Sequence, residues 1–488
     1  MKNFNERKYY ETLKFILFKS VNELYPKLEI RIENSLNNGV YCRVLTEDNI
    51  TEDKINKIKK KMDELIKKDL EIKLICDNIE KIKKKINMIS REDVKRLVEN
   101  IGLISIKEYE MEGYRDYFYE ELYSRTGYIY LYDLYLYGEG FILKFPKNNN
   151  PKKLPEYVDY KKLGEVFKES ALWHSILDVS CVGCLNEKNL EEKMPELIRI
   201  NEILHNSKLN KIAKEIIKNK KIKIVTIAGP SSSGKTTFTK KLRLHLMSEQ
   251  LNPLVISLDD YYVGRDNLPL DENGEKDYES IDALDIKLLN ENLEKLLRGE
   301  TVEIPKYDFK SGKRCKEGKI VKLMDRGIIL IEGIHGLNDK LLKNIQKENK
   351  YKIYISCLTQ LNIDSRNRIY TSDVRKIRRI VRDMLGRGTS GEETLEMWEK
   401  VRAGEEKNIF PYQENADAIY DSSLVYELGV LKILGEKELI KVKPQSKFYE
   451  EAKRLLKFLD YFLPVESSEV PDDSILKEFI GGSFFYKY

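Results

Sequence analysis

Two patterns of apolar and polar residues divide the chain. Beyond residue 222, five short apolar runs alternate with longer amphipathic stretches. The runs are IVTIA at 224–228, LVISL at 254–258, IILIEG at 328–333, YKIYIS at 351–356 and ADAIY at 416–420. Strands that are apolar throughout and alternate with helical stretches are typical of a parallel sheet whose crossover helices cover its faces. The pattern predicts an α/β domain over residues 222–443.

Residues 1–146 mix helical and strand patterns. Thr51 precedes a stretch in which large apolar residues recur with helical spacing among lysines, so we expect a helix capped by the Thr51 hydroxyl. The segment GYIYLYDLYLYGEGFILKF at 127–145 alternates on both sides of a Gly-Glu-Gly break, which predicts a β-hairpin. We interpret its tyrosines as sheet-packing residues rather than a base-stacking surface. The region is predicted to be an α+β domain.

Two further regions complete the predicted organisation. The polar segment KNNNPKKLP at 147–155 is typical of a linker, and residues 147–221 are expected to form a linker and helical connector. Beyond Pro444 a helical pattern returns, with one apolar face between residues 446 and 463. We expect residues 444–488 to form a C-terminal helical tail that packs on the core.

Composition excludes several classes of protein. The 488 residues hold 86 Lys and Arg against 81 Asp and Glu, and a formal charge of +5 argues against a polybasic nucleic-acid coat protein. Six Cys and four His do not make a disulfide scaffold and leave little room for His-based metal chemistry. No apolar run reaches the roughly 18 residues of a membrane-spanning helix, and the N-terminus lacks the features of a secretory signal. We expect a cytoplasmic protein without a membrane partner.

A glycine-rich segment follows the first apolar run. GPSSSGKT at 229–236 fits the pattern G-x-x-x-x-G-K-[ST] between a predicted strand and a predicted helix, where backbone N–H groups surround phosphate oxygens. In this pattern Lys235 reaches the β and γ phosphates, and the Thr236 hydroxyl binds Mg²⁺. The expected ATP-binding residues are Gly229, Pro230, Ser231, Ser232, Ser233, Gly234, Lys235, Thr236 and Thr237. ATP and Mg²⁺ are therefore the expected cofactors.

Two carboxylates follow predicted strands near this segment. Asp259 comes directly after LVISL, and Glu332 ends the run IILI. The carboxyl ends of parallel strands meet at the edge of the sheet where ligands bind, so both side chains are expected beside the phosphates. Asp259 could take the proton of an acceptor hydroxyl. Glu332 occupies the place from which P-loop enzymes hold Mg²⁺.

An arginine-rich helix is predicted near residue 380. Its arginines recur at i, i+3, i+4 and i+7, and they are Arg375, Arg378, Arg379 and Arg382. Like charges on one helix face need anions or acids to neutralise them, and guanidinium groups suit phosphate. Because a Gly-Arg-Gly break follows, we interpret the helix as a mobile lid over the γ-phosphate. Arg382 is expected to bind substrate. The alternative is a solvated face paired with Asp373 and Asp383.

These motifs resemble the uridine kinase and phosphoribulokinase group of P-loop kinases. The matching pieces, in order, are GPSSSGKTT, SLDDYY, DYESIDALD, VEIPKYDF, IILIEG and TSDVRKIRRIVRD. The resemblance implies transfer of the ATP γ-phosphoryl group to a hydroxyl, with Asp259 as the base, Lys235 on phosphate and Glu332 near the metal. It further implies that Arg375 and Arg378 are catalytic arginines of the lid. It also implies that Tyr262 and Tyr307 are aromatic residues of a nucleoside pocket.

Two positions depart from that family's pattern. Glu279 stands where the family has a uridine-reading Asp, and Gly312 stands where it has a pocket His. Loss of the imidazole removes hydrogen bonds that a pyrimidine requires, so the resemblance does not carry uridine over as the acceptor. Glu279 stays a candidate substrate-binding residue.

Residues 15–146 resemble the second additional domain of threonyl-tRNA synthetases. The resemblance rests on FKSVNELYPKLEIRIENSLNNGVYCRV, on the TEDKINKIKKKMDELI stretch and on SRTGYIYLYDL. That domain hydrolyses mischarged tRNA with an H-x-x-x-H pair and a later Cys and His. Here the pair aligns with Glu11 and Phe15, and the first His of the chain is His174. The resemblance therefore implies a binding or regulatory module, or a structural relic, without the hydrolytic site.

Three functions stay open at this point. The first is an ATP-dependent kinase of a small-molecule hydroxyl, most simply a nucleoside kinase. The second keeps the kinase and changes the acceptor to a sugar or sugar phosphate. The third is an RNA- or tRNA-binding regulatory protein switched by a nucleoside triphosphate, although the balanced charge counts against a large RNA footprint.

One cysteine motif falls outside these functions. Cys181-Val-Gly-Cys184 is a single C-x-x-C. A zinc site would need a second pair of ligands, and a redox site would need the strand–helix start of a thioredoxin-type unit. We interpret the motif as a chance spacing.

Overall fold

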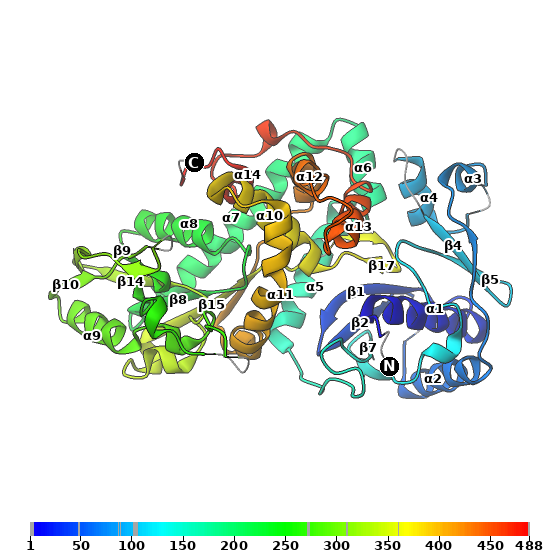
Figure 1. The fold of residues 1–488 in the computed structure, drawn as a ribbon, viewed down its shortest axis with the longest axis horizontal. Helices are drawn as coiled ribbons and strands as arrows, with labels where there is room; N and C mark the ends of the chain where they lie inside the picture. Colours follow the sequence, from blue (N-terminus) through cyan, green and yellow to red (C-terminus); the bar gives the residue numbers. More distant parts are fainter. Residues whose placement is uncertain are drawn as a thin grey trace. The chain divides into compact units, whose positions relative to one another are not determined.

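The computed structural model describes residues 4–46, 49–85, 87, 89–100, 106–270, 274–308, 311–359 and 361–486 (Figure 1). The chain forms two compact units. Unit 1 holds Met1–Met194, Thr359–Tyr370 and Arg454–Pro464, and unit 2 holds Pro195–Leu358, Thr371–Lys453 and Val465–Tyr488. The units differ from the sequence-based boundaries in two ways. The connector is shared between them, and two short pieces from the C-terminal half belong to unit 1.

The larger sheet of unit 1 is antiparallel. Its strands lie in the order β1-β2-β7-β6. Their bounds are Ile30–Leu36 for β1, Gly39–Val44 for β2, Asp133–Tyr137 for β6 and Gly140–Lys144 for β7. The pairing of Tyr137 with Gly140 closes the hairpin that the alternating pattern predicts. Tyr41 and Tyr137 face each other with ring centroids 5.8 Å apart, so these two tyrosines have a packing role.

Two helices supply much of the core of unit 1. They are α1 (Glu6–Leu24) and α2 (Glu52–Lys67). The Thr51 hydroxyl accepts a hydrogen bond from the Lys54 N–H, as expected for an N-cap. The apolar stripe of α2 is buried together with the inner face of α1 and of the sheet. Burial of this amphipathic face stabilises the helix, since a helix of this length is marginal alone.

A second, smaller sheet lies in unit 1. It has the order β3-β4-β5, with β3 at Lys73–Cys76, β4 at Lys107–Met111 and β5 at Tyr114–Phe118. The short helices α3 (Ile79–Lys83) and α4 (Glu92–Glu99) accompany it. Val94, Val98 and Ile106 form a separate apolar cluster there. Further along the chain come α5 (Lys161–Ile176) and α6 (Val182–Leu190).

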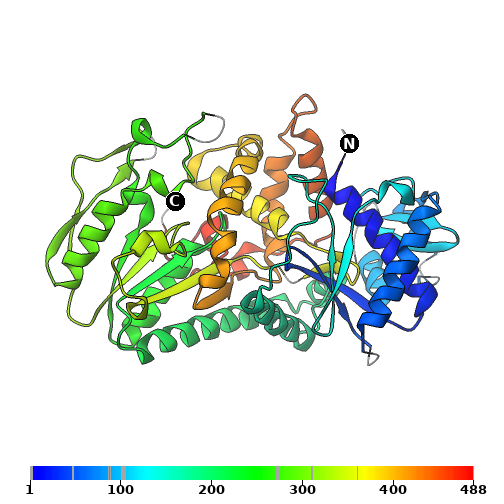
Figure 2. The same cartoon turned by 90° about the horizontal axis from the view of Figure 1, so that it is seen from below.

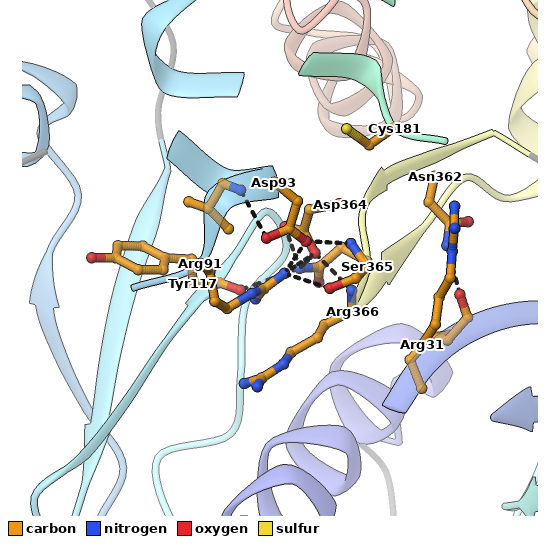
Figure 3. A network of polar contacts seen from close by, with 12 residues as sticks. Arg31, Arg91, Asp93, Tyr117, Cys181, Asn362, Asp364, Ser365 and Arg366 are labelled. Carbon is orange, nitrogen blue, oxygen red and sulfur yellow. Dashed lines mark hydrogen bonds and ion pairs between the residues drawn. The ribbon is translucent and has the colours of Figure 1, made fainter. Parts of the chain in front are cut away.

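The piece Thr359–Tyr370 joins unit 1 through a buried polar network (Figure 3). It carries β16 (Asn362–Asp364) and β17 (Asn367–Arg368). The Asp364 carboxylate accepts from Arg91 at 2.7 Å, and Arg91 also donates to Asp116 at 2.9 Å. Arg366 pairs with the same Asp116. Because Asp116 and Asp364 are buried, each needs its cationic partner, and this requirement ties the piece to unit 1.

Unit 2 is built on the parallel sheet that the apolar runs predict. Its strand order is β18-β15-β8-β14-β9, and every pair in it is parallel. The strands are β8 (Ile224–Ala228), β9 (Asn252–Ser257), β14 (Gly327–Glu332), β15 (Lys350–Ser356) and β18 (Ala418–Asp421). The β8 strand is central and wholly buried, and its carboxyl end lies between those of β15 and β14. Two ribbons extend the unit, one pairing β10 (Thr301–Ile304) with β13 (Lys319–Lys322), the other β11 (Tyr307–Asp308) with β12 (Lys313–Arg314).

Helices flank the sheet of unit 2. They are α7 (Met194–Lys218, its first residue in unit 1), α8 (Lys235–Ser248), α9 (Ile286–Leu297), α10 (Thr371–Arg387), α11 (Gly391–Asn408), α12 (Glu427–Leu439) and α14 (Lys477–Ile480). Figure 2 shows α7 as one long, continuous helix ahead of β8. The helix expected between 446 and 463 is α13 (Tyr449–Leu459), which passes from unit 2 into unit 1. Among the described residues, no helix combines the length and apolar character needed to cross a membrane.

Candidate active site

The glycine-rich loop joins β8 to α8. A Cβ at position 229 would lie 1.9 Å from the carbonyl oxygen of Ile355, so the neighbouring strand leaves room only for glycine. Gly234 has φ +84° and is the N-cap of α8, a conformation that favours glycine. These two constraints curl the loop around the N-terminus of the helix, which is where an anion is favoured.

Lys235 is the first residue of α8. Its ammonium group donates to the carbonyl oxygens of Gly229 and Pro230, at 2.7 and 2.9 Å. Desolvation lowers its pKa, and the carboxylates of Glu332, Glu478 and Asp259 act against that effect. Two of these three acids, Glu332 and Asp259, are the ones that the sequence predicts beside the phosphates.

Two of these acids come from adjacent strands. Glu332 ends β14 and pairs in register with Ser257 at the end of β9, two residues before Asp259. Burial raises the pKa of Glu332 to about 7, with a further contribution from Asp259, while Lys235 and a hydrogen bond from the Thr236 hydroxyl oppose the shift. Desolvation likewise raises the pKa of Asp259, which keeps solvent access. The structure thus brings Lys235, Thr236, Asp259 and Glu332 to one edge of the sheet.

Glu279 belongs to the same group of acids near Lys235. Its Cγ is 2.6 Å from where a Cβ of Gly404 would stand, so the glycine lets this side chain pack against α11. Desolvation raises the pKa of Glu279 to about 7, the charge of Glu405 adds to the shift, and Lys235 and Arg379 oppose it. Glu279 is therefore near the phosphate-binding lysine as well as near a second acid.

The two expected pocket tyrosines are neighbours. The ring centroids of Tyr262 and Tyr307 are 5.5 Å apart and their planes are tilted by 44°. The Tyr262 hydroxyl donates to the backbone oxygen of Tyr278 at 2.9 Å, and the Tyr307 N–H donates to Asp260 at 3.4 Å. Tyr262 follows β9 and Tyr307 lies on β11, so contacts between segments far apart in sequence bring the two rings together.

Gly312 provides room for an arginine. It has φ +69°, and a Cβ at this position would lie 2.4 Å from Cδ of Arg265. The Arg265 N–H also donates to the Gly312 carbonyl at 3.0 Å. A cavity of about 480 Å³ is lined by Val263, Gly264, Arg265, Asp266, Asn267, Asp282, Asp285, Lys313 and Arg314. An arginine side chain thus passes beside the position at which the resembling family carries histidine.

The arginine helix α10 is packed rather than solvated. Arg375 and Arg378 are 1 % and 0 % exposed. Arg375 donates to the Ser231 carbonyl at 2.9 Å and pairs with Glu405. Arg378 donates to the Ser232 carbonyl at 3.3 Å and pairs with Glu427 at 2.5 Å. Acids do neutralise the face, as its charge requires, and the two expected lid arginines hold the backbone of the glycine-rich loop.

The other two arginines of this face have different partners. Arg379 donates to the Ser231 hydroxyl at 2.7 Å. Arg382 donates from Nε to Asp383 at 3.1 Å. Sequence reasoning assigned no role to Arg379, although its place in the same i, i+4 pattern put it on the face that contacts the loop. Arg382, expected to bind substrate, is oriented by its own neighbour.

The C-terminal segment contributes a residue that sequence reasoning missed. Glu478 accepts hydrogen bonds from the N–H and hydroxyl of Thr237, at 3.1 and 2.7 Å. A Cβ at Gly234 would lie 2.5 Å from Ile475, and Lys241 pairs with Asp473 at 2.8 Å. The tail therefore rests on the first turns of α8, and only its distance in sequence concealed this.

Comparisons with known proteins find relatives for the segment that holds this site. The model of the "Phosphoribulokinase / Uridine kinase family" matches residues 224–426. The uridine kinase of Anoxybacillus flavithermus is 31 % identical over 201 residues, which are 41 % of this chain and 86 % of that protein. The uridine kinase of Macrococcus caseolyticus is 32 % identical over 200 residues, 41 % of this chain and 87 % of that protein. A solved structure described as a possible uridine kinase from Bacillus stearothermophilus is 20 % identical, covering 44 % of this chain and 98 % of that one, with a TM-score of 0.30.

Proposed function

The chain belongs to the phosphoribulokinase/uridine kinase family and is a phosphotransferase with an alcohol group as acceptor, and from this premise we propose that it transfers the γ-phosphoryl group of ATP to a nucleoside hydroxyl. One observation carries the proposal. The charge of the loop lysine acts on Asp259, the charge of Asp259 acts on Tyr262, and the Tyr262 ring lies beside that of Tyr307. A phosphate donor and a flat acceptor can therefore meet beside a base.

In the proposed chemistry, one group of residues binds the phosphates and another activates the acceptor hydroxyl. The N–H groups of the loop and Lys235 would hold the β and γ phosphates, because a helix N-terminus and a lysine both favour anions. Asp259 would accept the proton of the acceptor hydroxyl as that oxygen attacks phosphorus. Its raised pKa makes it a better proton acceptor than an ordinary surface carboxylate. Arg375 and Arg378 would act by holding the loop in shape.

The residues present fit a magnesium ion. The Thr236 hydroxyl lowers the pKa of the Glu332 carboxyl group, so the two are near each other, and both are hard oxygen ligands of the kind Mg²⁺ prefers. When bound there with ATP, the ion would offset the negative charge of the phosphates. We propose Thr236 and Glu332 as its protein ligands.

The acceptor pocket favours a nucleoside through its aromatic pair. Two tyrosine rings about one ring-diameter apart offer stacking surface to a flat base, an interaction of roughly 1–3 kcal/mol per base. Glu279 adds a hydrogen-bonding carboxyl group near Tyr262. Gly312 offers no side chain to read a pyrimidine, so we do not assign uridine itself.

A second acceptor class is favoured by a specific observation. Arg265 occupies the space beside Gly312, and Lys313 and Arg314 line the same cavity. Cationic groups at this place suit an acceptor that already carries a phosphate, as a sugar phosphate does. Asp285 neutralises part of this charge by pairing with Arg314 at 3.1 Å, which weakens the case relative to a nucleoside.

An acceptor screen separates these two readings. Purified full-length protein would be given Mg·ATP with single nucleosides, sugars or sugar phosphates, and ADP release would be measured. We expect a nucleoside to give the highest kcat/KM. A sugar phosphate with the highest value would replace the nucleoside by the second acceptor class, and ADP release with no acceptor above background would contradict both.

The role of Asp259 has its own test. Asp259→Asn should lower kcat by roughly 10²–10⁴-fold because the base is lost, while Mg·ATP affinity stays within a few-fold. The control is Asp325→Asn, an exposed carboxylate in the turn before β14, which should change neither. Near-full turnover by Asp259→Asn would remove this residue from the mechanism.

For unit 1 we propose a non-hydrolytic module related to the synthetase domain. Glu11 and Phe15, which stand where that domain has its histidine pair, are both buried in α1, and Glu11 pairs with Lys14 at 2.6 Å. An internal ion pair and an aromatic core residue leave no acid–base pair at this place. A deacylation assay with mischarged tRNA should therefore show no activity above buffer.

A further inference from the structure

The C-x-x-C motif of unit 1 forms a close pair of thiols. The Sγ atoms of Cys181 and Cys184 are 2.8 Å apart, and both cysteines are free and buried. Cys181 is the N-cap of α6, and its Sγ accepts the Cys184 N–H at 3.4 Å. A turn of this kind directs both side chains to the same side of the helix N-terminus. The spacing that the sequence alone left as chance is therefore a juxtaposition in space.

The intervening residues bring a cation to the pair. A Cβ at Gly183 would lie 2.6 Å from the backbone nitrogen of Leu97, so this glycine lets α4 approach α6 closely. On α4, the residue before Leu97 is Arg96, whose guanidinium lies 3.7 Å from the Cys184 sulfur. The Ser180 hydroxyl is 4.0 Å from the same sulfur. Two donors and a helix N-terminus thus converge on Cys184.

These surroundings favour the thiolate of Cys184. The hydrogen bond from the Cys181 thiol, helped by Arg96 and Ser180, lowers the pKa of Cys184 to about 6, against the opposing effect of burial. The nearby acids Glu187 and Asp93 act on the pair through Arg96 and Cys181. A thiolate beside a second thiol is the arrangement that supports reversible oxidation.

A metal role is less well supported. Over the part of the chain that the structure describes, there is no group of three or more His, Cys, Asp and Glu side chains placed to hold a metal ion. A structural zinc site takes four such ligands. The neighbouring segment is β16, which Cys181 joins through a parallel bridge to Asn362, and its side chains are already engaged in the polar network of Figure 3.

We propose that Cys181 and Cys184 form a redox-active dithiol that hydrogen peroxide converts to an intramolecular disulfide. The Cys184 thiolate attacks one peroxide oxygen and breaks the O–O bond. The released hydroxide takes up a proton and leaves as water, and Cys184 becomes a sulfenic acid. The Cys181 sulfur then attacks Cys184, the S–O bond breaks, and a second water leaves with the Cys181 proton. The two cysteines lose two electrons and two protons, which the peroxide takes up.

Mass spectrometry of tryptic peptides from the treated full-length protein tests this step directly. Reduced full-length protein is treated with hydrogen peroxide, remaining thiols are alkylated, and the chain is cut with trypsin. The peptide 169–188 contains both cysteines and no others. We expect it to lose two hydrogen atoms and to resist alkylation, and dithiothreitol should restore two reactive thiols. Two alkylated cysteines at a peroxide dose that oxidises the exposed Cys315 would overturn the proposal.

Single substitutions assign the roles of the two thiols. In Cys181→Ser, the sulfenic acid at Cys184 should persist and be trapped by dimedone, with several-fold more adduct than in the unsubstituted chain. In Cys184→Ser, oxidation of Cys181 should slow by at least about tenfold, since this thiol lacks the contact with Arg96. Equal dimedone trapping in the unsubstituted chain and Cys181→Ser would contradict a resolving role for Cys181. One equivalent of zinc in purified protein, protecting both thiols, would assign the pair to a metal instead.

Discussion

At the scale of single residues, the candidate active site concentrates carboxyl groups whose charged form is disfavoured. Asp259, Glu279 and Glu332 all have raised pKa values, and desolvation is the largest cause for each. Lys235 is the cation that lowers the pKa of all three carboxyl groups. Such clusters are typical of sites that bind a cationic or metal-bearing ligand, because the ligand supplies the missing positive charge.

The free-energy cost of ionising such a carboxyl group can be measured at Glu279 in the ligand-free protein. Its folded-state pKa of about 7 exceeds the ordinary value, so the folded chain holds this proton more tightly than the unfolded chain. The associated stability is present below about pH 4.5 and is lost as pH rises through about 7. We expect Glu279→Gln to raise the unfolding free energy by about 1–2 kcal/mol at pH 8 and to leave it unchanged at pH 4, as read from urea unfolding of ligand-free protein.

A matched surface variant guards this result. Glu291→Gln changes an exposed glutamate on α9 and should give the same unfolding free energy as the unsubstituted chain at both pH values. A Glu279→Gln effect of equal size at pH 4 and pH 8 would point to altered packing against Gly404 instead of titration.

At the scale of elements, α10 and the C-terminal tail define the shape of the glycine-rich loop. Arg375 and Arg378 on α10 bind two of its backbone carbonyls, and Glu478 near the chain's end binds the N–H of Thr237. Backbone groups that lack partners in a tight loop are costly when buried, so these contacts hold the loop in its curled form. Two elements far apart in sequence therefore support one phosphate-binding turn.

The ion pair of Arg378 tests the contribution of α10. Arg378→Met should cost about 3–5 kcal/mol of unfolding free energy because it leaves the buried Glu427 without its cation. Adding Glu427→Leu should recover much of that loss, since both charges are then gone. Arg387→Met, at an arginine whose side chain is 57 % exposed, is the control and should cost well under 1 kcal/mol. Equal losses of unfolding free energy for Arg378→Met and Arg387→Met would contradict a buried ion pair between Arg378 and Glu427.

The tail contact predicts an effect on nucleotide binding. Glu478→Gln removes the charge from the acceptor of two Thr237 hydrogen bonds, and we expect several-fold weaker Mg·ATP binding by calorimetry. Removal of residues 471–488 should weaken binding further, because Ile475 also leaves the surface of Gly234. The control Glu466→Gln alters an exposed residue just ahead of the tail and should bind Mg·ATP normally. Unchanged affinity after truncation would show that α8 holds the loop without the tail.

At the scale of the whole molecule, the two units are interleaved along the chain. The chain passes from one unit to the other five times, at residues 194, 358, 370, 453 and 464. The stretch held by unit 1 between residues 359 and 370 leads directly into α10 of unit 2. Neither unit is a continuous segment of sequence, so each is assembled from segments that lie far apart along the chain.

This interleaving predicts that residues 1–194 will not reproduce unit 1. The fragment lacks Asp364 and Arg366, which leaves Arg91 and Asp116 with incomplete pairing. We expect its thermal transition, followed by circular dichroism, to be broadened and shifted well below that of the full chain. A peptide of residues 359–370 should restore part of the shift, and the same peptide with Asp364→Asn should restore less. A fragment as stable as the full chain would contradict the dependence.

The elements of both units were largely predictable from local pattern. Five apolar runs gave five parallel strands, and Thr51 capped its helix as its side chain requires. The glycine-rich loop was also predictable from its motif, and Gly234 meets a local backbone requirement because its φ is +84°. Gly229, by contrast, is required by the carbonyl of Ile355 on a strand distant in sequence. The gathering of Asp259 and Glu332 followed from a topological rule about parallel strands rather than from the residues themselves.

Contacts between segments far apart in sequence could not be predicted without the tertiary structure. The sequence by itself determined the strands, the phosphate-binding loop and the charge of the arginine face, since each depends on residues close together in the chain. Only the fold decided that the buried arginines hold the loop, that Glu478 supports it, that Arg265 fills the space beside Gly312, and that Cys181 and Cys184 meet beside Arg96. The physical reason is that burial and pairing partners of a charge are set by what packs around it, which no local pattern encodes.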